Sequence, residues 1–318
     1  MYLKITVIIC THNPRFEYLD RVLDSLRTQT LAKEQWELVL IDNASVQTLN
    51  DHIDISWHPH YRYIREDRLG LTPARLRGIE EAHSEILIFV DDDNILNSNY
   101  LDIVLQINER WPILGAWGGQ ILPEFEEMPP DWTKPYWGYL AIREFNQDQW
   151  SNLLHQHEVT PFGAGLCVRK IVAEKYSNLV KNDSKRINLD RKGKLMLSGG
   201  DIDLACTSCD IGLGMGLFTS LKLMHLMPAI RLSEEYLLKI VEGSTYSQVI
   251  LDSLRDKIPL ERSFYSKALL QIRRWLMKPQ ERRFHDAYFR GFNLALHEIK
   301  TLSDNKATEN LKFQSNRV

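Results

Sequence analysis

Apolar and polar positions alternate along the first hundred residues in blocks that predict strands and helices in turn. Apolar runs, typical of strands buried on both faces of a sheet, predict strands at 5–10, 36–41 and 86–90, and we expect a short strand at 61–65. The segments between them carry apolar residues at helical spacing, and we expect helices to begin at Asn13-Pro14 and at Thr72-Pro73. This pattern predicts a doubly wound parallel α/β sheet, whose ligands bind beyond the carboxyl ends of the strands.

The pattern is less regular after residue 115. It predicts a strand broken by glycines at 115–122, a Pro- and aromatic-rich stretch at 129–139, and a turn with a strand at 161–169. It also predicts a helix that follows residues 198–201 and runs through Cys209, and a last strand at 217–227. From about Ser233 the chain becomes helical and amphipathic. We therefore predict a main domain over residues 1–230, with halves 1–115 and 116–230, and a helical C-terminal extension over residues 231–318.

Composition and charge exclude several classes of function. The 318 residues are 44% hydrophobic and 25% charged, as in ordinary globular proteins. A net charge of -3 leaves no excess of cations for a phosphate backbone, so we expect no nucleic-acid partner. Met1 leads into a β-branched run too short for a signal core, and no stretch reaches ~18 uncharged apolar residues, so we expect a cytoplasmic protein. Cys206 and Cys209 have zinc-knuckle spacing without a second ligand pair, and we interpret them as reduced thiols.

Three consecutive aspartates, Asp91, Asp92 and Asp93, end the fourth predicted strand. Their mutual repulsion calls for a cation. In an extended segment Asp91 and Asp93 would point to one side and Asp92 to the other. Two carboxylates on one side suit a hard divalent ion, Mn²⁺ or Mg²⁺, shared with substrate phosphates. A solvated acidic turn that caps the next helix is the alternative, and the position at the ligand-binding edge of the sheet favours the metal.

Four motifs in order resemble glycosyltransferase family 2. They are Val-Ile-Ile-Cys-Thr-His-Asn at 7–13, Leu-Ile-Asp-Asn-Ala-Ser at 40–45, Gly-Leu-Thr-Pro-Ala-Arg at 70–75 and Phe-Val-Asp-Asp-Asp at 89–93. The resemblance extends more weakly to about residue 230. It implies a GT-A fold, Rossmann-like with a mostly parallel sheet flanked by helices, here with a C-terminal helical extension. It also implies a UDP-, GDP- or dTDP-sugar donor, a divalent metal and an inverting reaction.

The resemblance implies roles for individual residues. The nucleotide-sugar would be bound by Thr11, Asn13, Asp42, Arg75, Asp91, Asp92, Gly163 and Gly165. Within this set, Asp42 would accept a hydrogen bond from the base, and Arg75 would approach the diphosphate or ribose. Asp93 would ligate the metal directly, and His225 would be a further ligand. Asp91 would contact the ribose or a water bound to the metal. The alternatives are a surface arginine on a helix for Arg75 and a satisfied core residue for His225.

An inverting transfer needs a carboxylate that takes the proton of the acceptor. The segment 197–204 resembles the acidic family motif that precedes a helix, but it lacks one acidic residue of the usual pair. The resemblance therefore implies Asp201 as the base and Asp203 as its support, with the choice between them open. A helix N-terminus that simply favours carboxylates is the alternative.

Aromatic residues in two regions have open roles. Trp132 and Trp137 would form a surface for a sugar acceptor, or else part of the core. The C-terminal helices interleave basic and aromatic residues, which suits peripheral contact with an anionic membrane and a lipid-linked acceptor. The same pattern suits a helical cap or a homo-oligomer contact, which we favour.

The sequence thus predicts transfer of a sugar from a nucleotide-diphosphate sugar to a glycan, a lipid-linked sugar or a similar acceptor, in surface polysaccharide assembly. One alternative is a sugar nucleotidyltransferase, but Thr-His-Asn-Pro-Arg at 11–15 stands where such enzymes carry a Gly-rich basic loop. The other is an inactive carbohydrate-binding homologue, which the aspartate triplet and Asp201 argue against.

Overall fold

β1 (Ile5–Thr11) is buried from Ile5 to Ile9, as a strand covered on both faces must be. In the computed structural model, which describes residues 3–154, 156–187, 189–190, 196–257 and 264–315, β1 lies between two parallel partners. These are β2 (Trp36–Asn43) and β4 (Ile86–Val90), and β3 (Tyr61–Glu66) pairs in parallel with β2. The four strands predicted from the first hundred residues therefore form one parallel half-sheet.

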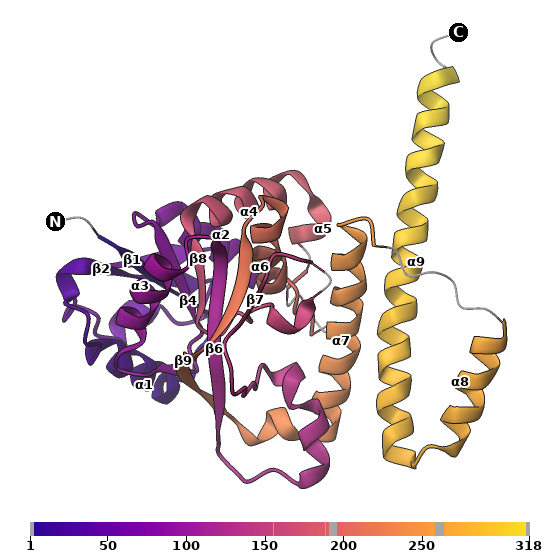
Figure 1. The fold of residues 1–318 in the computed structure, drawn as a ribbon, viewed down its shortest axis with the longest axis horizontal. Helices are drawn as coiled ribbons and strands as arrows, with labels where there is room; N and C mark the ends of the chain where they lie inside the picture. The colour runs from indigo at the N-terminus through magenta and orange to yellow at the C-terminus, as the bar shows by residue number, and fades with distance from the viewer. Residues whose placement is uncertain (1–2, 155, 188, 191–195, 258–263, 316–318) are drawn as a thin grey trace. The chain divides into compact units, whose positions relative to one another are not determined.

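The second half of the sheet is mixed. β8 (Leu166–Arg169) pairs antiparallel with β4 and with β6 (Leu114–Phe125), and β6 pairs in parallel with β9 (Gly214–Met227). The short strands β5 (Asn94–Leu96) and β7 (Gln149–Ser151) pair antiparallel with β9. The described residues thus form a nine-stranded sheet, in the order β3-β2-β1-β4-β8-β6-β9-β5 with β7 beside β9 (Figure 1). This architecture is the expected fold, a sheet flanked by helices with helices at the C-terminus.

Helices cover both faces of the sheet, and each face has its own apolar core. On one face the core includes residues of α1 (Phe16–Arg27) and α3 (Tyr100–Arg110), packed around Trp36 and Trp117. On the other it includes residues of α2 (Leu71–Glu81), α4 (Lys170–Asn182) and α6 (Gly200–Asp210), packed around Phe89 and Tyr176. Short helical segments complete the main fold, namely η1 (Lys33–Gln35), η2 (Leu49–Asp51), η3 (Asp131–Leu140), η4 (His157–Val159), α5 (Ser184–Ile187) and η5 (Ala229–Leu232).

The predicted start of the first helix is wrong. α1 begins at Phe16 with Arg15 at its N-cap, and Asn13 lies before it with a left-handed backbone (φ 49°). The Asn13 side chain accepts a hydrogen bond from the backbone N–H of Val46 at 2.9 Å. Because that carbonyl oxygen serves a neighbouring loop, it is not used to cap the helix, and the chain turns once more before the helix starts.

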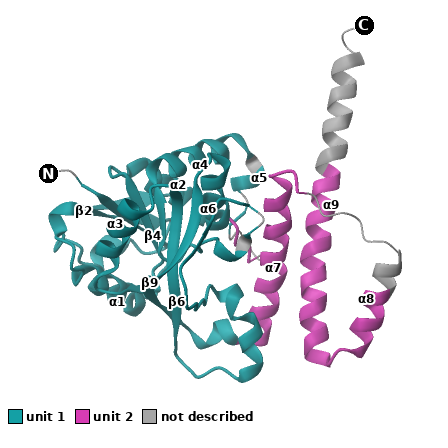
Figure 2. Cartoon of the chain, in the orientation of Figure 1, with its two compact units in different colours: residues 1–191, 200–232 teal, residues 192–199, 233–318 magenta. Residues whose placement is uncertain are grey.

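The chain divides into two compact units, residues 1–191 with 200–232 and residues 192–199 with 233–318 (Figure 2). The second unit contains α7 (Glu234–Ser253), α8 (Phe264–Leu276) and α9 (Pro279–Ser315). α7 packs along α9 at Gly291, where an added Cβ would lie 2.1 Å from the Glu242 carbonyl oxygen. Among the helices that the structure describes, none has the length and apolar character needed to cross a membrane.

Candidate active site

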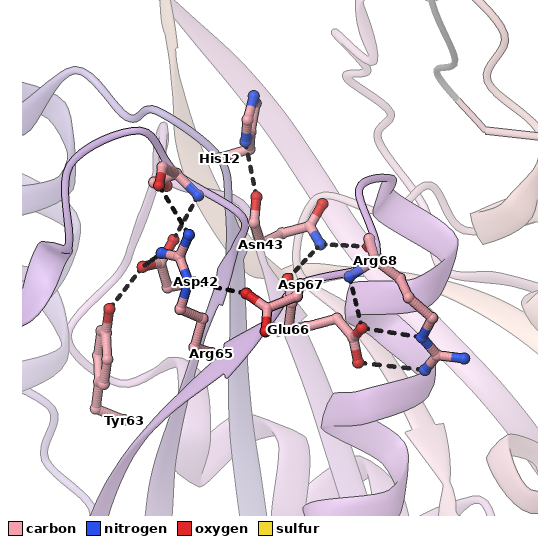
Figure 3. A network of polar contacts seen from close by, with 9 residues as sticks. His12, Asp42, Asn43, Tyr63, Arg65, Glu66, Asp67 and Arg68 are labelled. Carbon is pink, nitrogen blue, oxygen red and sulfur yellow. Dashed lines mark hydrogen bonds and ion pairs between the residues drawn. The ribbon is translucent and has the colours of Figure 1, made fainter.

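The carboxyl ends of β2 and β3 hold a buried aspartate in a network of donors (Figure 3). The Asp42 carboxylate accepts hydrogen bonds from the Tyr63 hydroxyl at 2.6 Å, from Arg65 Nη1 at 2.9 Å and from the Ser45 backbone N–H at 3.1 Å. Burial alone would raise the pKa of Asp42, but the hydrogen bonds from Ser45 and Tyr63 and the charge of Arg65 lower it. Asp42 is therefore an ionised, oriented carboxylate.

Asn43, the next residue, ties three loops together at the same edge. Its side-chain amide donates to the backbone carbonyl of Arg68 at 2.8 Å, and its carbonyl accepts from the Gly70 N–H, also at 2.8 Å, just before α2. Its backbone carbonyl contacts His12 Nδ1 at 2.7 Å (Figure 3). The backbone N–H of Asn13, beside His12, donates a hydrogen bond to Ser45 Oγ at 3.0 Å. These contacts fix the loops that follow β1, β2 and β3.

The three aspartates form a turn, which corrects the extended geometry expected for them. The Asn94 backbone N–H donates to the Asp91 carbonyl oxygen at 3.1 Å, because the chain must change direction between β4 and β5. Asp92 accepts a hydrogen bond from the Thr11 hydroxyl, and burial together with the Asp93 charge raises the pKa of Asp92 to about 7. Each aspartate therefore has different surroundings rather than sharing one side of a strand.

Asp93 lies in a buried group of cationic and basic partners. Its Oδ2 atom is 2.9 Å from Arg231 Nη1 and 3.4 Å from His225 Nε2, and Asn94 donates to its Oδ1 at 3.0 Å. Burial alone would raise the pKa of Asp93, but His225, when its ring is protonated, and the charge and hydrogen bond of Arg231 hold it well below its usual range. Arg231 Nη1 also lies 3.1 Å from His225 Nε2. Since a guanidinium has only donors, this contact uses the lone pair of Nε2.

The lone pairs of Asp93 Oδ2 and His225 Nε2 thus converge on one cation, which here is Arg231. A carboxylate and an imidazole are suitable ligands for a divalent ion such as Mn²⁺, and such ions often take one or two protein ligands and complete their shell with phosphate and water. Across the residues that the structure describes, no group of three or more His, Cys, Asp or Glu side chains is arranged to hold a metal. The two residues therefore fit a metal shared with a substrate, not a site built from protein ligands alone.

Arg75 is buried next to the triplet rather than on the helix surface. Its Nη1 lies 3.1 Å from Asp190 Oδ2, and the charges of Asp190, Asp201 and Asp91 outweigh burial to raise its pKa. Asp190 also accepts from the Thr72 hydroxyl at 2.7 Å and from the Gly200 backbone N–H at 3.0 Å. One carboxylate thus joins the start of α2 to the start of α6.

The two acidic residues of α6 face different partners. The Asp201 carboxylate accepts a hydrogen bond from the Gly163 backbone N–H at 2.7 Å, and it lies close enough to Arg75 and Asp91 to affect both of their pKa values. Asp203 is fully buried, and both of its carboxylate oxygens contact Arg186 Nη1, at 2.5 and 2.6 Å. Two residues apart on a helix, the side chains point in nearly opposite directions.

The other predicted site residues lie farther from this group of charges. Gly165 (φ 70°) packs against Tyr100, whose hydroxyl donates to its carbonyl at 2.7 Å, so a glycine is required there by packing. Trp132 and Trp137 are half-buried in η3, and Trp137 packs on Phe125 with ring centroids 5.1 Å apart. The structure gives Trp137 a packing role, and acceptor binding by Trp132 and Trp137 stays a prediction.

Sequence reasoning missed four residues of the site, namely Tyr63, Arg65, Asp190 and Arg231. Tyr63 and Arg65 lie on the third predicted strand, whose short apolar pattern gave no sign of a polar role. A search for partners of the predicted charges, Asp42 and Asp93, could have selected Arg65 and Arg231 as candidates.

Comparisons with known proteins place this geometry in context. The sequence model of the family described as "Glycosyl transferase family 2" matches residues 6–167, about half of the chain. A Drosophila melanogaster protein named polypeptide N-acetylgalactosaminyltransferase 8 is 32% identical over 103 residues, which cover 31% of this chain and 18% of that protein. The glucosyl-dolichyl phosphate glucuronosyltransferase of Haloferax volcanii is 22% identical over 145 residues, 42% of this chain and 44% of that protein.

A third relative is the cholesterol galactosyltransferase of Borreliella burgdorferi, 31% identical over 104 residues, 32% of this chain and 28% of that protein. The matches thus span less than half the length of each of these three relatives. Among solved structures, S. aureus TarS 1-349 superimposes with a TM-score of 0.53 at 15% identity, covering 92% of this chain and 81% of that one. A second TarS structure, in complex with UDP-GlcNAc, gives a TM-score of 0.52 at 13% identity, covering 90% and 79%. At these identities the likeness to TarS shows the fold.

Proposed function

The chain belongs to glycosyl transferase family 2, and we propose that it moves a sugar, with inversion, from a nucleotide-diphosphate sugar to a carbohydrate or lipid-linked acceptor. One observation carries this proposal. A cation position at Asp93 and His225, the buried Arg75 and the carboxylate of Asp201 gather beyond the carboxyl ends of β1 and β4. This is where open α/β sheets bind their ligands.

We assign the donor to the first half of the sheet. The loops after β1, β2 and β3, fixed by Asn43, would hold the nucleoside, with Thr11, Asn13 and Asp42 near it. Ser45, Tyr63 and Arg65 keep Asp42 ionised and oriented, and such a carboxylate would accept the hydrogen bond of a base N–H. A nucleotide-sugar donor is supported by the solved TarS complexes with UDP and UDP-GlcNAc, although the sugar and base of this chain's donor stay open among UDP, GDP and dTDP types.

We assign the diphosphate to the neighbourhood of Asp93. Asp93 and His225 would hold a divalent ion, Mn²⁺ or Mg²⁺, which when bound supplies positive charge against the departing diphosphate. Arg75 and Arg231 provide two further positive charges at the same place. A guanidinium with two or more N–H donors binds phosphate oxygens well, so Arg231 would exchange Asp93 for the diphosphate when the donor arrives.

We assign the base to Asp201. Among the described residues it accepts one hydrogen bond, from Gly163, and it lies at the start of α6, whereas both oxygens of Asp203 are engaged by Arg186. A base needs a free lone pair for the acceptor hydroxyl, and Asp201, with Gly163 on its Oδ2 atom, would offer its other oxygen. The geometry therefore favours Asp201, with Asp203 anchoring the helix.

The acceptor is the least constrained part of the proposal. The names of the relatives include a dolichyl phosphate sugar, a sterol and a polypeptide as acceptors, which supports transfer in general rather than one acceptor. We propose a glycan or lipid-linked sugar of surface polysaccharide assembly, with Trp132 and Trp137 as candidate contacts for its rings. A cytoplasmic site of action stays a prediction.

A panel of nucleotide-sugars tests the proposal. The full chain is melted with each of UDP-, GDP- and dTDP-sugars, with Mn²⁺, with Mg²⁺ and with a chelator. A donor that binds only the folded chain raises the melting temperature, and we expect this for one nucleotide type with metal present. No shift with any donor in any condition would contradict the proposal.

A further inference from the structure

Within the second unit, α8 is attached to α9 by its polar side. Arg274 donates to both carboxylate oxygens of Asp286, at 2.6 and 2.7 Å. Arg282, in the first turn of α9, donates to the backbone carbonyls of Arg274, Trp275 and Met277, the last of which follows the end of α8. These contacts add a donor to carbonyls in and just after the last turn of α8, and they fix which face of α8 is turned toward α9.

The opposite face of α8 is apolar and exposed. Leu269, Ile272 and Leu276 follow one another at helical spacing and are 67%, 59% and 72% exposed, and Trp275 beside them is 77% exposed. An amphipathic helix of a globular protein normally turns its apolar stripe toward the protein. In this unit the Arg274–Asp286 ion pair attaches the polar side of α8 to α9 instead. The four large apolar side chains therefore stay exposed and form a surface suited to a partner.

The charge around this surface identifies the kind of partner. Residues 264–283 contain one acidic residue, Glu281, and six basic ones, Lys267, Arg273, Arg274, Lys278, Arg282 and Arg283, although the whole chain has a net charge of -3. Arg273 and Lys278 are exposed at the edge of the apolar face or next to it. A second copy placed on this face would bring two basic segments together, whereas an anionic bilayer attracts such a segment.

We propose that α8 is a membrane-surface helix that seats its apolar face in the boundary of an anionic lipid bilayer. Leu269, Ile272 and Leu276 would enter the outer acyl region, and Trp275 would take the position near the headgroups that its amphipathic ring prefers. Arg273 and Lys278 reach outward to lipid phosphates. The helix lies along the surface, and its 13 residues are too few to span a bilayer. This inference concerns binding alone and holds whether or not sugar transfer is established.

Flotation of the full chain with lipid vesicles tests it. We expect the chain to float with vesicles of phosphatidylcholine mixed with phosphatidylglycerol, less with phosphatidylcholine alone, and less as salt is raised. The double substitution Ile272→Ser with Trp275→Ser removes apolar area from the exposed face and should lower vesicle binding at least about tenfold. Ile171→Ser is the matched control, because Ile171 on α4 is 60% exposed and lies outside this face, and it should bind as the unchanged chain does.

A second variant separates charge from fold. Arg273→Glu with Lys278→Glu leaves the Arg274–Asp286 contact in place and should reduce binding to anionic vesicles while binding to neutral ones changes little. Equal flotation of the chain and the Ile272→Ser/Trp275→Ser variant would overturn the proposal, as would failure of the unchanged chain to float with anionic vesicles at low salt. Self-association in sedimentation that this double variant abolishes would instead assign the face to a second copy, and it would also overturn the proposal.

Discussion

The Gly163 backbone N–H donates a hydrogen bond to the Asp201 carboxylate at 2.7 Å. This contact joins two segments that the sequence marks separately, a glycine-containing turn before β8 and the first turn of α6. The space beside the Cα atom of Gly163 is very small, because an added Cβ would lie 2.9 Å from Asp201 Oδ2 and 3.0 Å from Arg75 Nη2. The glycine therefore holds the position of the proposed base by its lack of a side chain.

Gly163→Ala should reduce transfer strongly while the chain stays folded. The added methyl group must displace Asp201 or Arg75, and a base displaced by a fraction of an ångström loses much of its contribution. We expect the turnover number to fall at least about tenfold, with a much smaller change in melting temperature. Gly138→Ala is the matched control, because a Cβ there meets no atom of the described structure within 4 Å. Equal turnover by both variants would show that the Gly163–Asp201 contact does not position the base.

Asp190→Asn should destabilise the main unit and weaken donor binding together. The substitution leaves the buried Arg75 without a full counter-charge and weakens the hydrogen bonds to Thr72 and to the start of α6. Breaking such a buried pair costs roughly 3 kcal/mol, which urea unfolding would detect. Asp131→Asn, whose side chain is 91% exposed, is the control and should change stability by less than about 0.5 kcal/mol. Unchanged stability and donor affinity in Asp190→Asn would refute this role.

His58 should make the main unit less stable in mild acid. It is fully buried against Trp36, with ring centroids 4.0 Å apart, and its Nδ1 accepts the backbone N–H of His60 at 3.1 Å. Its Nε2 has no hydrogen-bond partner among the described residues. Burial therefore favours the neutral ring and lowers the pKa of His58 to about 4.

Because the unfolded chain binds a proton at His58 near pH 6.5 and the folded chain near pH 4, stability from this residue is complete above pH 6.5 and falls as the pH drops toward 4. At pH 5 the loss is about 2 kcal/mol relative to pH 7. Replacing His58 by Gln removes the titrating group, so the difference in urea unfolding free energy between pH 7 and pH 5 should shrink by about that amount. An identical pH dependence in His58→Gln would assign the acid sensitivity to other groups.

The sequence predicts the first half of the fold well because three of its four strands, β1, β2 and β4, are largely apolar runs. Such runs are buried on both faces, and in this chain β1, β2 and β4 occupy the middle of the sheet. The second half is harder to predict. β5 and β7 have three residues each, and their pairing with β9 depends on contacts between distant segments rather than on local pattern.

The same contrast holds for the site. Asp42, Asp93 and Asp201 are visible in the sequence because each lies in a recognisable local motif. Asp190 is not, since its partners Thr72 and Arg75 are 118 and 115 residues away and no pattern surrounds it. The predicted helix start at Asn13 and the predicted extended arrangement of Asp91 to Asp93 were wrong for a related reason. The chain forms the hydrogen bonds of these polar groups between separate loops, and residue spacing along a single helix or strand does not predict such contacts.

The comparison of Asp201→Asn with Asp93→Asn tests the central claim most directly. Donor affinity is measured by calorimetry with Mn²⁺ and with a chelator, and sugar transfer by release of the nucleotide with the acceptor present. Asp201→Asn should bind the donor as the unchanged chain does and lose transfer at least about a hundredfold, because only the base is removed. Asp93→Asn should lose the part of donor affinity that depends on Mn²⁺. Transfer by Asp201→Asn at the rate of the unchanged chain, or Mn²⁺-dependent donor binding that survives in Asp93→Asn, would contradict the account.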